Sequence, residues 1–241
     1  MTPPLSPLEG LTYPGRLIII GRASGGPAVV LYAITGRSAS SQARRLVQRE
    51  AGVWVEPTDE AVLRQGRVEL LVYPALLISA GGVAVSNGRQ TADVRDAVAA
   101  GAAPVAALAA ALARWDFEPD APTFTPRISG CVTASGAALS IIKRSPDGGT
   151  LRSYFEVPDS PERGRLVSTY QGENRDPLPA FAGEPLEVSL PAGGARETAE
   201  AAYAALGPRP GNPDFRVAVA CYRYRGTAGP EVHIINRHER T

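Results

Sequence analysis

The sequence predicts an α+β fold built mainly from antiparallel β-sheet. Segments with strand character and segments with helix character occur in separate blocks, whereas a doubly wound sheet requires them to alternate. Short turn-forming stretches at residues 24–27 and 145–149 join neighbouring strands into hairpins, which makes those pairs antiparallel. The chain contains no Gly-x-Gly-x-x-Gly, P-loop or Gly-x-Ser-x-Gly motif.

The first part of the chain divides into an arm and the start of a sheet. Residues 1–14 are rich in proline and lack periodicity, so we expect an irregular arm followed by one domain at residues 15–241. The branched apolar run at 16–22 predicts a strand, and residues 28–34 return from the turn as its partner. A helix is expected to start near Ser38, while residues 50–67 have no clear pattern.

Later strands are predicted from short apolar runs bounded by turn residues, and helices from alanine-rich or amphipathic runs. The predicted strands are 68–73, 75–79, 82–86, 128–133, 138–143, 151–156, 166–170, 186–190, 215–224 and 231–235, with Pro74 breaking the first from the second. The predicted helices are 92–103, 104–114 and 195–206, which we expect to cover sheet faces.

Composition limits the kinds of partner and site. The formal net charge of +1 gives no global field toward nucleic acid or an anionic membrane, so an anion site must be local. The two cysteines lie inside apolar runs and both histidines lie in the C-terminal tail, which argues against a disulfide scaffold and a metal site. The sequence has no membrane-spanning run and no signal pattern, so a cytoplasmic protein is expected.

Polar loops follow several predicted strands. Arg37 and Ser38 come directly after the strand at 28–34, and a guanidinium among hydroxyls suits a phosphate or a carboxamide. Asn87 and Gly88 form a second loop ahead of Thr91, which can cap the next helix. Ordinary strand–helix junctions and plain turn chemistry are the alternatives for these two loops.

Further candidates lie at other strand ends. Pro126 keeps the chain extended before Arg127. Lys143 ends an apolar run and is a weaker phosphate candidate, with a solvated lysine as the alternative. Arg22 lies beside the first turn, where a surface charge is the alternative. The polar stretch that begins at Tyr170 and includes Glu173 also follows a strand.

Five short motifs occur in order: 13–16 (Tyr-Pro-Gly-Arg), 36–38 (Gly-Arg-Ser), 86–88 (Ser-Asn-Gly) with Thr91, 125–128 (Thr-Pro-Arg-Ile) and 168–173 (Ser-Thr-Tyr-Gln-Gly-Glu). As a set they resemble the archaeal-type IMP cyclohydrolases and their bacterial relatives, from about residue 13 to residue 236. The resemblance implies a four-layer α-β-β-α sandwich like that of the N-terminal nucleophile hydrolases, without an autoprocessed nucleophile. It implies a purine ribonucleotide substrate and no metal or cofactor.

The implied reaction closes the ring of 5-formamidoimidazole-4-carboxamide ribonucleotide to inosine monophosphate and releases water. On this basis the expected catalytic residues are Tyr32, Arg37, Asn87, Arg127 and Glu173. The expected substrate-binding residues are Arg22, Ser38, Gly88, Thr91, Lys143 and Tyr170. Nearby arginines would lower a tyrosine pKa, which favours Tyr32 or Tyr170 as a base.

Several alternatives stay open at this point. The chain could bind a nucleotide without catalysis, or it could be a serine-dependent amidohydrolase of the same fold that uses Ser38 or Ser41. Substrate positioning and an oxyanion site could also carry the reaction without a side-chain acid or base. The sequence leaves the oligomeric state open, including a homo-oligomer.

Overall fold

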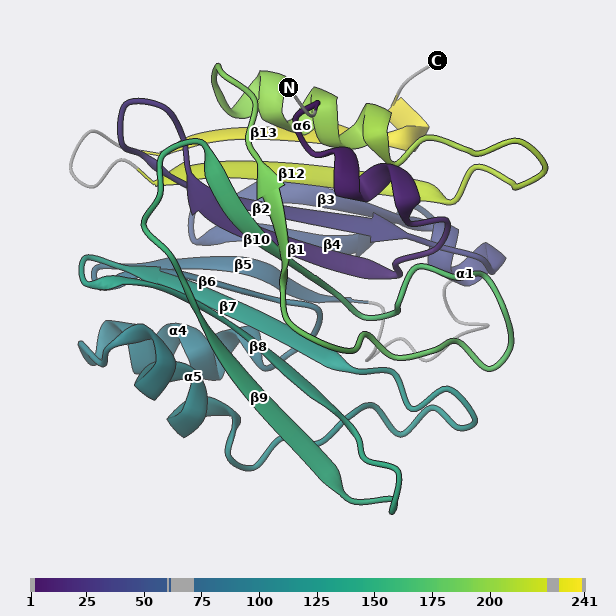
Figure 1. Ribbon diagram of the computed structural model, residues 1–241, viewed down its shortest axis with the longest axis horizontal. Coiled ribbons are helices and arrows are strands. Elements are labelled where there is room, and N and C mark those ends of the chain that lie inside the picture. The colour runs from purple at the N-terminus through teal and green to yellow at the C-terminus, as the bar shows by residue number, and fades with distance from the viewer. Residues whose placement is uncertain (1–2, 60, 62–71, 225–229, 240–241) are drawn as a thin grey trace.

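A computed structural model describes residues 3–59, 61, 72–224 and 230–239. In this part of the chain, two antiparallel sheets face each other, and helices cover the outer face of each sheet (Figure 1). The layers therefore follow the order helix, sheet, sheet, helix, and the α+β prediction with mostly antiparallel sheets is confirmed.

The first sheet is six-stranded, with β1 and β2 at its centre as a hairpin. The 3-10 helix η1 (Ser6–Gly10) and helix α6 (Ala195–Ala205) pack on its outer face, so the arm that was expected to be irregular contains a helical turn with buried leucines. In spatial order the strands are β11 (Leu186–Ser189), β10 (Arg163–Ser168), β1 (Arg16–Arg22), β2 (Ala28–Thr35), β12 (Arg216–Tyr224) and β13 (Glu231–Asn236).

The second sheet is seven-stranded and follows the order of the chain. Helices α4 (Thr91–Ala99) and α5 (Pro104–Leu112) cover its outer face. Its strands are β3 (Arg44–Arg49), β4 (Gly52–Pro57), β5 (Tyr73–Ser79), β6 (Gly82–Ser86), β7 (Arg127–Thr133), β8 (Gly136–Arg144) and β9 (Thr150–Val157).

Strand alternation explains why the central strands are apolar throughout. In β1, Ile18 and Ile20 face the second sheet, while Leu17 and Ile19 face η1 and α6. All four side chains are fully buried, and each contributes about 1.5–3 kcal/mol by leaving water. At one edge, the Asn236 amide accepts a hydrogen bond from the Leu46 backbone N–H at 2.8 Å and donates to its carbonyl at 3.0 Å, which ties the sheets together.

The fold differs from the sequence-based expectations in three places. The helix expected at Ser38 is only the turn α1 (Ala39–Gln42), because Arg44 already starts β3. Strands β3 and β4 were not predicted. Strand β5 continues through Pro74, which lies opposite Trp54 where the register shifts, a position where a sheet tolerates proline. The predicted strand at 68–73 lies mostly outside the described residues.

Candidate active site

A buried polar cluster lies between the two sheets, at the end where β1 begins and β2 ends. The first sheet contributes Arg16 and Tyr32, and the second sheet contributes Arg44 and Tyr73 from β3 and β5. All four side chains are buried, and Arg44 interacts electrostatically with the other three. Two facing sheets thus direct two guanidiniums and two phenols to one place.

The backbone around Arg16 fixes the start of β1. Gly15 has φ 73°, and a side chain there would collide with Thr169 and Tyr170, so the motif requires glycine at this position. The Arg16 N–H donates to the Thr169 hydroxyl at 3.1 Å, and the Thr35 hydroxyl donates to the Gly15 carbonyl at 2.9 Å. These bonds join β1, β2 and the segment after β10 directly beside the cluster.

Glu118 is the buried carboxylate of the cluster. It lies in the proline-rich crossing after α5, with its side chain 3% exposed. Its Oε1 lies 3.3 Å from Arg16 Nη2 and 3.7 Å from Arg127 Nη1. Burial raises the pKa of Glu118 above its ordinary value of 4.5, and the neighbouring guanidiniums of Arg16 and Arg127 oppose that rise. A carboxyl with a raised pKa beside hydrogen-bond donors is suited to carry a proton.

Arg127, a predicted catalytic residue, belongs to this cluster. Its Nε donates to the Asp116 carbonyl at 2.8 Å, and its Nη1 donates to Gln90 Oε1 at 3.2 Å. The guanidinium also lies over the Trp115 ring, 4.9 Å from the centroid. Burial lowers the pKa of Arg127, but an arginine remains protonated in proteins. Arg127 is therefore a cation that these contacts hold in place next to Glu118.

The predicted loop 86–88 contacts the residues on either side of Arg127 and the Arg127 guanidinium itself. Asn87 is fully buried; its amide donates to the Pro126 carbonyl at 2.8 Å and accepts from the Ile128 N–H at 2.9 Å. A side chain on Gly88 would meet Arg127 Nη1 at 2.8 Å, so glycine leaves room for the guanidinium. The Thr91 hydroxyl donates to the Gly88 carbonyl at 2.7 Å. The contacts of these three residues are those of positioning groups.

Tyr32 and Tyr73 form a hydroxyl pair, with 2.7 Å between the two oxygens. Burial raises the pKa of Tyr32 well above 10, and the adjacent Tyr73 adds to this, whereas Arg16 and Arg44 lower it. The expectation that arginines would bring a tyrosine pKa toward neutrality is therefore wrong for Tyr32, because desolvation outweighs their charge. Tyr32 stays a neutral hydrogen-bond donor.

Tyr170 behaves in the same way and links the cluster to the surface. Burial raises its pKa to about 12, although Arg16 and the bond to Thr125 act in the opposite direction. Its hydroxyl lies 2.8 Å from the Thr125 hydroxyl, and its ring stacks on Tyr13 with 5.7 Å between centroids. The Arg37 guanidinium lies over the Tyr13 ring, 5.4 Å from its centroid.

The predicted loops at 36–38 and 170–177 meet at the surface. Arg37 donates to Asp176 at 2.8 Å and to Asn174 at 3.4 Å, with its side chain 31% exposed. Glu173 is exposed and pairs with Arg175, so the structure does not bring it to the buried cluster. Arg37 contacts the Tyr13 ring, Tyr13 stacks on Tyr170, and Tyr170 interacts electrostatically with Arg16 of the cluster.

The serine-dependent alternative finds little support in the contacts of its candidate nucleophiles. The Ser38 hydroxyl bonds with the hydroxyls of Ser40 and Ser41 and accepts from the Ser41 N–H, which forms the cap of α1. Ser41 in turn donates to the Ser38 carbonyl. Within the described residues, none of the partners of these two hydroxyls is a general base.

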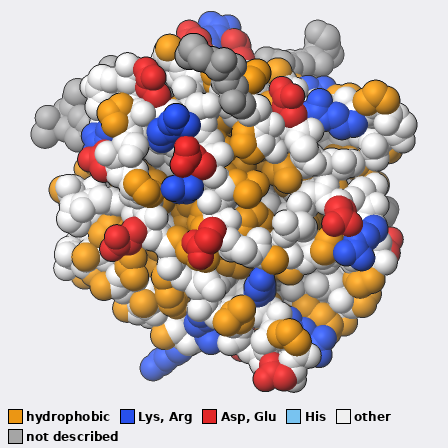
Figure 2. All heavy atoms as spheres, in the orientation of Figure 1, with side chains coloured by type: hydrophobic (Ala, Val, Ile, Leu, Met, Phe, Trp, Pro, Cys, Tyr) orange, Lys and Arg blue, Asp and Glu red, His pale blue; other side chains and the backbone are white. Residues whose placement is uncertain are grey.

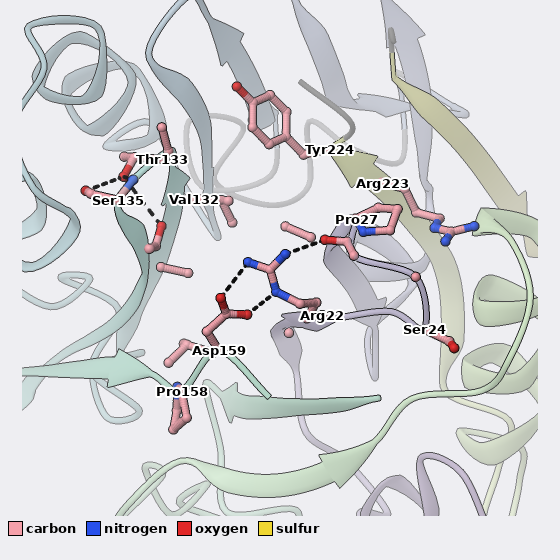
Figure 3. Close-up of a pocket in the computed structure, with 18 residues that line it drawn as sticks. Arg22, Ser24, Pro27, Val132, Thr133, Ser135, Pro158, Asp159, Arg223 and Tyr224 are labelled. Carbon is pink, nitrogen blue, oxygen red and sulfur yellow. Dashed lines mark hydrogen bonds and ion pairs between the residues drawn. The ribbon is translucent and has the colours of Figure 1, made fainter. Parts of the chain in front are cut away.

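Two predicted substrate-binding residues have hydrogen-bond partners outside the cluster. Lys143 Nζ donates to the Phe181 carbonyl at 2.8 Å. Arg22 lies at the far end of β1, roughly 20 Å from Arg16 for a strand of this length. There it lines a cavity of about 800 Å³ and pairs with Asp159 and the Gly26 carbonyl (Figure 3). Because this cavity lies at the opposite end of β1 from the buried cluster, it is a weaker candidate for a nucleotide that reacts at the cluster.

The sequence reasoning missed Arg16, Arg44, Tyr73 and Glu118 as site residues. The sequence pattern could have indicated the two arginines, because alternate residues of a strand face the same side. Arg16 lies two residues before buried Ile18, and Arg44 lies two residues before buried Leu46. Glu118 carries no local signal, because it lies in a loop and its partner Arg16 is 102 residues away in the chain.

The described residues contain no group of three or more His, Cys, Asp and Glu side chains arranged to hold a metal ion. They also contain no helix long and apolar enough to span a membrane. On the face drawn in Figure 2, basic and acidic side chains are interspersed, so that face has no patch of one sign for a polyanion.

Comparisons with known proteins agree with one another. A family model described as IMP cyclohydrolase-like protein matches residues 13–222. An IMP cyclohydrolase of Halobacterium salinarum is 29% identical over 191 residues, which cover 79% of this chain and 86% of that protein. That of Methanopyrus kandleri is 28% identical over 183 residues, 70% of this chain and 89% of that protein. That of Methanothrix thermoacetophila is 32% identical over 129 residues, 54% and 62% of the two chains.

Proposed function

The chain belongs to the IMP cyclohydrolase family, and from this membership we propose that it closes the purine ring of 5-formamidoimidazole-4-carboxamide ribonucleotide to give inosine monophosphate and water. The observation that carries the proposal is the buried Glu118 carboxylate between the guanidiniums of Arg16 and Arg127. All three residues lie inside the matched segment.

The reaction needs little beyond positioning, charge stabilisation and proton movement. The carboxamide nitrogen forms a bond to the formyl carbon of the same molecule, and one nitrogen proton passes to the formyl oxygen. The resulting hydroxyl group then receives a second nitrogen proton as the carbon–oxygen bond breaks, so that the oxygen departs as water. Holding the formamide in the reactive rotamer supplies much of the acceleration, because both reacting groups belong to one substrate.

Glu118 is the group that we assign to proton transfer. Its raised pKa keeps the protonated form accessible nearer to neutral pH, and Arg16 and Arg127 stabilise the carboxylate after it gives up the proton. Tyr32 and Tyr170 act as neutral donors, because both of their pKa values are raised. Asn87, Gly88 and Thr91 position Arg127.

The substrate is oriented with its reacting groups between the sheets and its phosphate toward the surface. Tyr13 and Tyr170 supply aromatic faces between the buried cluster and Arg37. Arg37 then binds the 5′-phosphate, with the Ser38 hydroxyl beside it, since a half-exposed guanidinium exchanges its contact with Asp176 for a doubly charged ligand. The layered fold supports a relationship to the N-terminal nucleophile hydrolases without an autoprocessed nucleophile.

Incubation with the formamido ribonucleotide tests the function. Purified protein is expected to produce inosine monophosphate in an amount proportional to enzyme and time, while a Glu118→Gln variant produces far less. Binding of inosine monophosphate without any turnover would instead identify a nucleotide-binding module, and the proposed activity would be wrong.

A further inference from the structure

The buried cluster carries more positive charge than negative charge. Arg16, Arg44 and Arg127 are each at most 9% exposed, and Glu118 is the carboxylate buried among them. Glu118 forms ion pairs with Arg16 and Arg127. Arg44 forms no ion pair within the described part of the chain, and its Nε donates to the Ser41 carbonyl at 2.8 Å. A guanidinium stays charged when buried, and an uncompensated buried charge is unfavourable. A bound anion would therefore neutralise the excess positive charge of the cluster.

Two donors of this cluster lack a partner. Arg16 Nε and Arg44 Nη1 are buried and form no hydrogen bond to any described residue. Buried donors are nearly always satisfied in folded proteins, and an unsatisfied pair in one place points to a missing ligand. Both guanidiniums interact electrostatically with Tyr32 and Tyr73, so the two unpaired donors belong to one buried cluster, with Arg16 on the first sheet and Arg44 on the second.

The tyrosine pair supplies a third donor. Two hydroxyl groups carry two hydrogens, and the 2.7 Å contact between Tyr32 and Tyr73 uses one of them. The second hydrogen remains for a ligand beside the two guanidiniums. Donors from β1, β2, β3 and β5 are thus fixed before any ligand arrives, which is the arrangement that stabilises a developing oxyanion most strongly.

We propose that Arg16 Nε, Arg44 Nη1 and the free hydroxyl hydrogen of the Tyr32–Tyr73 pair form an oxyanion site whose ligand is the formyl oxygen and not the 5′-phosphate. The identity of this ligand rests on the proposed function. Glu118 lies 3.3 Å from Arg16, and the group that protonates an oxygen must lie within hydrogen-bond reach of it. A phosphate dianion in the same place would be repelled by an ionised Glu118.

A small carboxylate tests the site without turnover. Sodium formate is titrated against sodium chloride at equal ionic strength, and the melting temperature is followed. The wild-type protein is expected to gain stability in a saturable manner with formate, and Arg44→Met is expected to lose that gain. Arg45→Met is the matched control, because Arg45 is the adjacent residue, is 45% exposed and pairs with Glu56. An equal formate response in wild type and Arg44→Met, or none in wild type, would overturn the site.

Kinetics separate the formyl oxygen from the phosphate. Arg44→Met is expected to lower kcat by about 10²–10³ with KM within a few-fold of wild type, because the contact forms in the transition state. A raised KM at unchanged kcat would show that Arg44 holds the phosphate and would overturn the assignment. If Arg44→Met fails to fold, Arg44→Lys takes its place. Lysine keeps the positive charge but lacks the forked N–H donors of the guanidinium, so we expect the same loss of kcat. A protein that binds formate through Arg44 but forms no inosine monophosphate would overturn the ring-closure function while supporting the anion site.

Discussion

Glu118 Oε1 lies 3.3 Å from Arg16 Nη2, although 102 residues separate the two in the chain. Arg16 starts β1 of the six-stranded sheet, whereas Glu118 follows α5, which covers the outer face of the seven-stranded sheet. The contact therefore brings a buried carboxyl from one side of the sandwich to the inner face of the other. The proton transfer that we propose at Glu118 would depend on correct packing of both sheets.

Replacement of the buried carboxyl is expected to remove proton transfer. Glu118→Gln keeps the shape but cannot exchange a proton, so kcat should fall about 10²–10⁴-fold. The wild-type profile of kcat/KM against pH should contain a limb from a carboxyl with a raised pKa, and the variant should lack it. A variant that keeps both its rate and that limb would remove Glu118 from the chemistry.

The same variant should alter how stability depends on pH. Because the folded-state pKa of Glu118 is raised, its contribution to stability is fully present below the ordinary value of 4.5 and is lost as the pH rises through the folded-state pKa. The melting temperature of Glu118→Gln relative to wild type should therefore improve from about pH 4 to about pH 8. A constant difference across that range would show that burial does not perturb this carboxyl.

Tyr32→Phe should lower turnover without changing the shape of the pH profile. The raised pKa of Tyr32 keeps its hydroxyl protonated, so the variant loses a donor and the 2.7 Å bond to Tyr73 but no titrating base. We expect kcat to fall about tenfold or more, with the profile between about pH 6 and pH 9 unchanged in form. Loss of a basic limb in the variant would instead identify Tyr32 as the base.

Arg37→Met should affect binding more than turnover. Loss of one charge-assisted contact with the phosphate is expected to raise KM about tenfold and leave kcat within a few-fold. Arg175→Met is the matched control, since Arg175 is exposed on the adjacent loop and pairs with Glu173. Equal Michaelis constants for wild type and Arg37→Met would exclude Arg37 from the phosphate site.

Asn87→Ala should destabilise the protein. The Pro126 carbonyl and the Ile128 N–H would lose their buried partner, at about 1–3 kcal/mol for each unsatisfied group. We expect the free energy of unfolding in urea to fall by roughly 2–6 kcal/mol, against less than about 0.5 kcal/mol for exposed Asn174→Ala. Comparable losses in the two variants would contradict the positioning role of Asn87.

The sequence predicts the fold best where strands are buried on both faces. The apolar runs of β1, β2 and β12 and the helix α6 stand out without any tertiary information. Strand β3 does not, because it lies at a sheet edge and four of its six residues are polar or charged (RRLVQR). Its buried positions depend on the facing sheet, which local patterns do not contain.

The site divides in the same way. Arg127 and the loop around Asn87 could be predicted, since turn residues and proline mark them locally. Glu118 could not, because its role arises from burial against Arg16 and from a pKa that burial raises. The expected direction of the Tyr32 pKa shift was wrong for the same reason, because the sequence does not show the loss of water around the hydroxyl, which outweighs the charges of Arg16 and Arg44.

A crystal structure with inosine monophosphate bound would show which residues surround the reacting atoms. We expect the purine ring to lie between the sheets, with the carbon that came from the formyl group facing Glu118 and the Tyr32–Tyr73 pair, and with the phosphate at Arg37. A nucleotide bound in the cavity beside Arg22 and Asp159, with Glu118 out of contact, would contradict it.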